Sequence, residues 1–148
     1  MERPVPGVSR IVVAIRGDRA LDASAVRLAC TLASRGEAVL SLIYVVVVPR
    51  SLPLSAVIEA AQSLGEEALD LAEEVATEAR IKVETQLLQA REVGPALVDE
   101  AKEWRADALV MGLPYRRRFG DFDFGNSAPY VIKNAHCHVI LFREALAH

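Results

Sequence analysis

Residues 108–143 decide the fold: ALVMG (108–112), LPYRRRFGDFDFGNS (113–127), APYVIKNAH (128–136) and CHVILFR (137–143). The first and last segments are short apolar runs typical of buried strands, and a helical pattern starts only after Asn126 and Ser127. In an open parallel sheet, a loop from the carboxyl end of a strand to the amino end of a helix lies where ligands bind, because free backbone N–H groups converge there. The loop after Gly112 is therefore the candidate site.

The rest of the chain repeats the same strand and helix unit. Apolar runs predict five strands, at Ile11–Ile15, Val39–Val48, Ile81–Leu88, Ala108–Met111 and Cys137–Arg143. Helical periodicity fills the segments between them, with Asp22, Ser55 and Ser127 as the expected N-caps and Gly36 as the end of the first helix. Alternating strands and helices with right-handed crossovers predict an α/β fold with a doubly wound parallel sheet and helices on both faces.

Length and composition indicate one domain that spans residues 1–148. Pro4, Pro6 and Gly7 make residues 1–9 an expected flexible lead-in. Hydrophobic residues are 52% of the chain and aromatic residues only 5%, which suits a parallel sheet with an aliphatic core. On the second helix, the acidic residues between 59 and 78 lie off the apolar stripe that begins at Val57, so we expect them to form a solvated face.

Several classes of protein are disfavoured. A net charge of −3 argues against a general nucleic-acid binder. The chain has no apolar run of about 18 residues and its first residues do not resemble a signal peptide, so we expect no membrane insertion and a cytoplasmic protein. Two cysteines, Cys30 and Cys137, are too few for a disulfide framework and are expected to be free.

The stretch after the fourth predicted strand resembles the universal stress protein family. That family closes with a strand, the pattern G-x2-G-x9-G-(S/T), a helix and a strand, and Gly112, Tyr115, Gly125 and Asn126 fall on the four marked positions. Gly112 and Gly125 match, whereas Tyr115 replaces a glycine and Asn126 replaces the hydroxyl residue, with Ser127 one place later. The resemblance implies an adenine nucleotide alpha hydrolase-like fold with strand order 3-2-1-4-5.

The resemblance also implies a ligand. In family members that bind ATP this loop holds the phosphates, so the expected ligand is small and anionic, an ATP- or AMP-type nucleotide bound in the crevice between strands one and four. The family usually has an aspartate after the first strand, and Arg16 occupies that position here. The predicted ligand-binding residues are Ile15, Arg16, Gly17, Val45, Gly112, Leu113, Tyr115, Arg116, Gly125, Asn126 and Ser127.

The side chains of the loop leave alternatives open. Arginines at strand ends and in the loop either form a cationic rim for phosphate or pair with nearby acidic groups: Arg16, Arg50, Arg91, Arg116, Arg117 and Arg118. Tyr115 either fills the crevice or stacks on a base. The three phenylalanines at positions 119, 122 and 124 are expected to pack the loop onto the domain, with a lid or a partner-docking patch as the alternative. His136, Cys137 and His138 are adjacent in sequence, which is not tetrahedral geometry, so no metal site is expected.

No nucleophile or Walker motif occurs, so a regulatory domain that binds its ligand without catalysis is the expected function. One alternative is a nucleotide-free dimeric interaction module that docks on a protein partner such as a transporter. A second is a weak nucleotide hydrolase, with Asp18, Asp121 or Asp123 as the base or metal ligand. An apolar last strand at a sheet edge predicts a homodimer through Cys137–Phe142.

Overall fold

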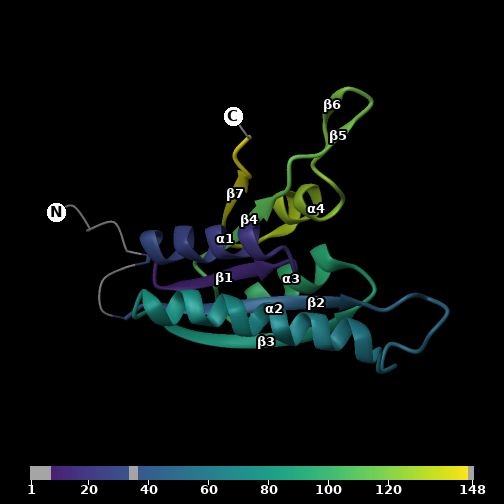
Figure 1. Cartoon of the computed structure of the whole chain (residues 1–148), viewed down its shortest axis with the longest axis horizontal. Coiled ribbons are helices and arrows are strands. Elements are labelled where there is room, and N and C mark those ends of the chain that lie inside the picture. Colours follow the sequence, from purple (N-terminus) through teal and green to yellow (C-terminus); the bar gives the residue numbers. More distant parts are fainter. Residues whose placement is uncertain (1–7, 34–36, 147–148) are drawn as a thin grey trace.

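The computed structural model describes residues 8–33 and 37–146, and its centre is a five-stranded parallel sheet (Figure 1). The strands lie in the order β3-β2-β1-β4-β7, so the predicted fold class and strand order are confirmed, with β7 as the fifth strand. Their bounds are β1 Arg10–Ile15, β2 Val39–Val47, β3 Lys82–Ala90, β4 Ala108–Leu113 and β7 His138–Arg143. Residues 1–7 of the predicted lead-in (residues 1–9) and the predicted helix end at Gly36 lie outside the described residues.

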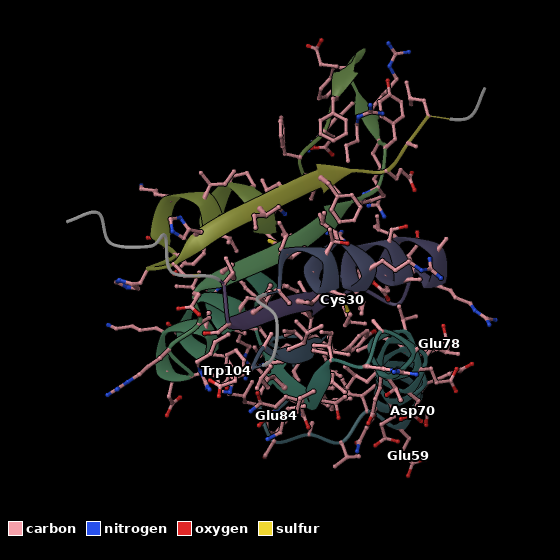
Figure 2. The ribbon with its side chains drawn as sticks, turned by 90° about the vertical axis from the view of Figure 1, so that its left-hand side faces the viewer. Cys30, Glu59, Asp70, Glu78, Glu84 and Trp104 are labelled. Atoms are coloured by element: carbon pink, nitrogen blue, oxygen red, sulfur yellow. The ribbon has the colours of Figure 1, made fainter. Side chains whose placement is uncertain are left out.

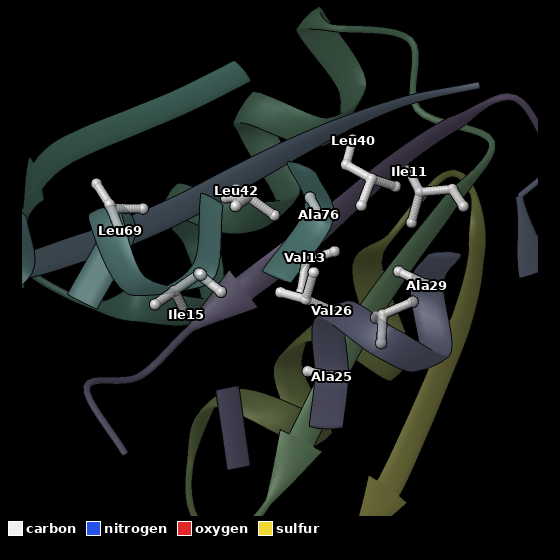
Figure 3. Packing of buried hydrophobic residues seen from close by; sticks show 12 residues of the cluster. Ile11, Val13, Ile15, Ala25, Val26, Ala29, Leu40, Leu42, Leu69 and Ala76 are labelled. Atoms are coloured by element: carbon white, nitrogen blue, oxygen red, sulfur yellow. The ribbon is translucent and has the colours of Figure 1, made fainter. Parts of the chain in front are cut away.

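Helices cover both faces of the sheet. α1 (Arg19–Leu32) and α2 (Glu59–Glu78) lie on one face, where Ile11, Val13 and Ile15 of β1 pack against them (Figure 3). α3 (Val93–Glu103) and α4 (Ser127–Asn134) lie on the other face, against Val12 and Ala14. Successive side chains of a strand point to opposite faces, so a strand between two helical layers must be apolar at every position. This is why β1 has no polar interruption.

The acidic face of α2 is exposed, as predicted. Figure 2 shows Glu59, Asp70 and Glu78 on the outer side of the helix, while Leu69, Ala72 and Ala76 are buried beneath it. Gly65 permits the close approach of α2 to the sheet, because a Cβ at that position would lie 2.6 Å from the Tyr44 ring. Figure 2 also labels Trp104, a partly buried side chain that packs against the hydrophobic cluster between the sheet and helices α3 and α4.

The predicted helix starts were wrong by a few residues. Asp18 is the N-cap of α1 and accepts a hydrogen bond from the Leu21 backbone at 3.1 Å, whereas Asp22 lies inside the helix. α2 begins after Ile58, well past Ser55, and Val57 is 69% exposed. Ser127 is the first residue of α4 and Asn126 precedes it. In each case the polar residue selected from the sequence lies near the helix start, but a different residue occupies the N-cap position.

The segment before α4 forms a hairpin that was not predicted. β5 (Arg117–Arg118) and β6 (Asp121–Phe122) pair antiparallel, and the hairpin projects away from the rest of the domain (Figure 1). Phe119, at its tip, is 93% exposed, so the expectation that this ring packs the loop onto the domain was wrong. Within residues 8–33 and 37–146, none of the helices combines the length and apolar character needed to cross a membrane.

Candidate functional site

A cavity of about 140 Å³ lies at the carboxyl ends of β1, β2 and β4, where these strands meet α3 and α4. It is lined by Ala14, Ile15, Arg16, Ile43, Tyr44, Val45, Val93, Leu97, Met111 and Ser127. The helix after β1, α1, lies on one face of the sheet, and the helix before β4, α3, lies on the other. The junction of β1 and β4 is therefore the point where the winding of the sheet reverses. The sequence predicts a crevice between the first and fourth strands, and the cavity is lined by the end of β1, by Met111 of β4 and also by three residues of β2.

Four of the predicted ligand-binding residues line this cavity: Ile15, Arg16, Val45 and Ser127. Six lining residues were missed, and three of them form one row across the sheet. Ala14 pairs in register with Ile43 on one side and with Met111 on the other. In the sequence these residues have the pattern of buried strand residues. Only the register of the strands shows that they lie side by side at the base of the cavity.

Asp22 fixes the turn that carries Arg16. The Asp22 carboxylate is 4% exposed, and its two oxygens accept hydrogen bonds from the backbone N–H groups of Arg16 at 2.8 Å and Gly17 at 2.9 Å. Burial raises the pKa of Asp22, although these two donors oppose the rise. Gly17 has φ +90°, a conformation that favours glycine. The sequence predicted a helix cap at Asp22, and the structure instead shows a carboxylate that holds the strand end in place.

The Arg16 side chain lies at the mouth of the cavity. One guanidinium nitrogen, Nη1, lies 3.5 Å from the carbonyl oxygen of Gly112, although much of the side chain remains exposed. Partial desolvation and then the nearby guanidinium of Arg116 lower the pKa of Arg16 below its ordinary value, although the charges of Asp22 and Asp18 oppose this fall. Arginine keeps its proton even when its pKa falls, so the mouth carries positive charge.

Gly112 is required by packing within the domain. A Cβ at this position would lie 2.8 Å from Leu21 Cδ1 and 2.9 Å from Phe142 Cζ. Gly125 differs, because it has φ +72° and open space around its α-carbon, and its N–H donates to Asp123 Oδ1 at 3.0 Å. Of the two glycines that match the family pattern, Gly112 is thus needed for close packing, and Gly125 is needed for the left-handed backbone conformation of a turn.

Tyr115 lies outside the cavity. Its ring packs 5.7 Å from that of Phe122, the Arg143 guanidinium lies over it at 5.1 Å, and its N–H donates to Glu144 at 2.8 Å. This side chain belongs to a second, more open groove of about 320 Å³, lined by Leu113, Tyr115, Phe122, Phe124, Leu141 and Arg143. Tyr115 therefore does not plug the cavity.

The six arginines do not assemble into one rim. Arg91 donates from Nη1 to the carbonyl oxygens of Val48, Pro49 and Leu52, so it orders the loop after β2. Arg117 and Arg118 are exposed on the projecting hairpin. Only Arg16 among the six lines the cavity, with Arg116 close enough to affect its ionisation. The cationic group that lines the cavity is therefore the single guanidinium of Arg16, smaller than the rim considered from the sequence.

The last strand carries the residues considered for metal binding. His136 and His138 are exposed on either side of Cys137, which is half-buried, and β7 begins at His138. Cys30 and Cys137 are free thiols, and burial raises the pKa of each. A raised pKa keeps a thiol protonated at neutral pH, so neither cysteine is an activated nucleophile.

Comparisons with known proteins agree with this architecture. The sequence pattern of the Universal stress protein family matches residues 7–143. A universal stress protein of Methanocaldococcus jannaschii is 32% identical over 80 residues, which are 54% of this chain and 46% of that protein, so the match spans about half the length of the relative.

Solved structures show the same fold. A universal stress protein from Archaeoglobus fulgidus superposes with a TM-score of 0.75 at 24% identity, over 90% of this chain and 97% of the other. The structure of the Archaeoglobus fulgidus protein in complex with dAMP gives a TM-score of 0.72 at 22% identity, over 92% and 98% of the two chains. Because the family pattern covers nearly all of the described fold, this chain belongs to the universal stress protein family.

Proposed function

We propose that this domain binds a small phosphorylated ligand, an adenine nucleotide, in the cavity between β1 and β4. The observation that carries the proposal is the composition of the cavity: an apolar interior with the Arg16 guanidinium at its mouth. Binding sites for whole small molecules typically measure about 300–1,000 Å³. A cavity of about 140 Å³ suits one ring system, with the charged remainder of the ligand outside beside Arg16. The dAMP complex of the structurally similar Archaeoglobus fulgidus protein supports a nucleotide.

The second part of the proposed site is the loop that leads into α4. Ser127 lines the cavity and begins α4, so the free N–H groups at the helix start can donate to phosphate oxygens. Gly125 and Asn126 lie directly before it, and Gly17 lies beside Arg16 on the β1 side. Leu113 and Tyr115 face the separate groove, so we assign them no part in the nucleotide site.

We further propose a regulatory role without turnover of the ligand. Hydrolysis of a phosphate ester needs a general base or a metal-bound water near the phosphorus. Asp18 caps α1, and the backbone N–H groups of Arg16 and Gly17 occupy both oxygens of Asp22. Asp123 accepts the Gly125 N–H, and Asp121 is exposed on β6. Three of these four carboxylates, those of Asp18, Asp22 and Asp123, already accept backbone hydrogen bonds, and this favours binding over catalysis.

Titration calorimetry with AMP and with ATP tests the site directly. We expect saturable binding to the native protein, and we expect Ala14→Leu to weaken it at least about tenfold, because the larger side chain occupies space that the ring needs. Ala60→Leu is the matched control, since Ala60 is exposed on α2, and it should bind like the native protein. Equal binding by Ala14→Leu and Ala60→Leu would place the ligand elsewhere.

A second candidate function, a dimeric module that docks on a protein partner, is favoured by Phe119. An apolar ring that is 93% exposed on a projecting hairpin is unusual for a surface without a partner. β7 lies at the free edge of the sheet, with its apolar residues only partly buried, so pairing with β7 of a second copy would form the homodimer. The hairpin stands clear of the sheet and would remain available to a partner.

Light scattering at micromolar concentration tests the dimer. We expect twice the mass of one chain, because an unpaired sheet edge gains backbone hydrogen bonds when it pairs. Phe119→Ser is the matched variant and should stay dimeric, because its side chain lies on the hairpin and not on β7. A monomeric native protein would rule out the β7 interface. A dimeric native protein with a monomeric Phe119→Ser variant would indicate that the interface lies at the hairpin.

A further inference from the structure

We infer that the β5–β6 hairpin docks in the groove between α1 and α2 of a second copy of this chain, with the Phe119 ring between the two helices. This contact rests on the second candidate function, in which the hairpin meets a partner, and it names that partner. It requires neither the nucleotide site nor pairing through β7. It is supported by the strained turn at Phe119, by the apolar floor of the groove and by the charges on both surfaces.

The tip of the hairpin has a backbone conformation that its sequence disfavours. Arg118 pairs with Asp121 across the hairpin, which leaves a two-residue turn between them. Its residues, Phe119 and Gly120, have φ +55° and +83°. Such a turn favours asparagine, aspartate or glycine at its first position, because a bulky side chain is strained at positive φ. The Phe119 ring is 93% exposed, so burial within the domain does not offset this strain, and contact with another molecule would.

The base of the hairpin is held by aromatic contacts. The Phe122 ring lies 5.7 Å from that of Tyr115 and 4.9 Å from that of Phe124, between ring centroids. Phe119 lies beyond this cluster, at the projecting tip (Figure 1). The hairpin therefore presents one apolar ring on a folded stalk.

The groove between α1 and α2 has room for such a ring. Its volume is about 400 Å³, and Leu64 in its wall is 62% exposed. The apolar residues that line it are Ala23, Leu64, Ala68, Leu71, Ala72 and Val75. Figures 1 and 2 place the hairpin and α2 on opposite sides of the domain. A hairpin in this arrangement reaches such a groove only on another copy of the chain.

The two sides of the groove carry opposite charges, and so do the two strands of the hairpin. The exposed charged residues that line the groove are Glu67, Glu74 and Glu78 on α2 and Arg19 and Arg27 on α1. The exposed charged residues of the hairpin strands are Arg117 and Arg118 on β5 and Asp121 on β6. A hairpin that enters with β5 beside α2 and β6 beside α1 thus places unlike charges together on both sides. An anionic membrane offers one sign of charge and would repel Asp121, so the groove is the better match.

The contact joins two different surfaces, so it is heterologous. Each copy offers one hairpin and one groove, and association therefore continues into rings or chains. The tip of one hairpin is smaller than a standard interface, so we expect a dissociation constant of about 0.1 mM. At low micromolar concentration the contact would be largely dissociated.

Sedimentation velocity between about 10 μM and 1 mM measures this association. We expect the average mass of the native protein to rise about twofold or more over that range. Phe119→Asn should show no rise, because asparagine suits the turn but removes the ring. The double variant Glu67→Lys, Glu74→Lys should show no rise either, because it reverses the charge of the α2 side of the groove. Mixed in equal amounts, these two variants should associate again, since one keeps an intact groove and the other an intact hairpin.

The double variant Glu59→Lys, Glu73→Lys is the matched control. It makes the same change of charge at exposed positions of α2 outside the groove and should associate like the native protein. If circular dichroism shows that the Glu67→Lys, Glu74→Lys variant does not fold, the native protein and Phe119→Asn still decide the question.

Two results would overturn the contact: a native mass that does not rise with concentration, or folded hairpin and groove variants that do not associate when mixed. Vesicles of phosphatidylserine provide a further arm. Native protein that does not self-associate but sediments with these vesicles, and loses this with Phe119→Asn, would assign the hairpin to an anionic membrane instead. None of these results changes nucleotide binding in calorimetry or the mass at low micromolar concentration, so both proposed functions are tested separately.

Discussion

Gly112→Leu is expected to lower the free energy of unfolding by about 3 kcal/mol or more, because the site has no room for a side chain. A Cβ alone would lie within 3.0 Å of side-chain atoms of Leu21, which is buried, and of Phe142, which is partly buried, so these side chains or the elements that carry them would have to shift. Denaturant unfolding followed by circular dichroism measures the change. The loss should be the same with and without nucleotide, since it arises from packing.

Gly125→Ala is the control for this prediction. Gly125 has φ +72° with open space around it, so alanine adds only the strain of a left-handed conformation, about 1–2 kcal/mol. We expect Gly112→Leu to be the more harmful of the two. If Gly112→Leu were tolerated and Gly125→Ala were not, the packing account of Gly112 would be wrong and the phosphate-loop account drawn from the sequence would regain support.

Asp107→Ala is expected to destabilise the protein by about 2–3 kcal/mol at neutral pH. Asp107 Oδ2 accepts three hydrogen bonds, from the Ser9 N–H and Ser9 hydroxyl at 3.0 Å each and from the Arg10 N–H at 2.8 Å. These bonds tie the start of β1 to the start of β4. Partial burial alone would raise the pKa of Asp107, but the donors from Arg10 and Ser9 outweigh it and lower the pKa below the ordinary value of 3.8.

The effect of Asp107→Ala should therefore depend on pH. A carboxylate whose pKa is lower in the folded state adds stability above its unfolded pKa and loses it as the pH falls through the folded value. The difference between native protein and variant should be constant near neutral pH and should shrink below about pH 3.8. Asp22 has a raised pKa, so the difference between native protein and Asp22→Asn should instead decline as the pH rises above 3.8. Carboxyl NMR titration checks both directions, and a shift of the same sign for both residues would contradict the account.

Local patterns in the sequence predicted most of the fold. The five parallel strands follow from apolar runs at the right spacing, since a strand covered on both faces must be apolar throughout. The strand order came from the family resemblance and is confirmed. Helix starts were less predictable: the pattern selected Asp22 as the cap of the first helix, whereas Asp18 is the cap and Asp22 instead accepts a hydrogen bond from the end of β1. The β5–β6 hairpin was missed because two-residue strands carry no periodic signal.

The candidate site was only partly predictable. Arg16 and Ser127 follow from their places after a strand and before a helix, and both line the cavity. Its floor did not follow, because Ala14, Ile43 and Met111 are distant in sequence and meet only through the register of β1 with β2 and β4. Tyr115 occupies a position of the family pattern, yet its side chain faces away, toward Phe122 and Arg143.

The sequence by itself determined the layered α/β architecture and the end of the sheet at which a ligand would bind, because periodicity and chain order dictate which faces are buried and where strands end. Only the tertiary structure decided which side chains surround the cavity and which point into solvent. Arg16 and Arg118 are the same kind of residue in the sequence. Asp22 fixes the turn of the first at the cavity mouth, and the projecting hairpin carries the second away from it.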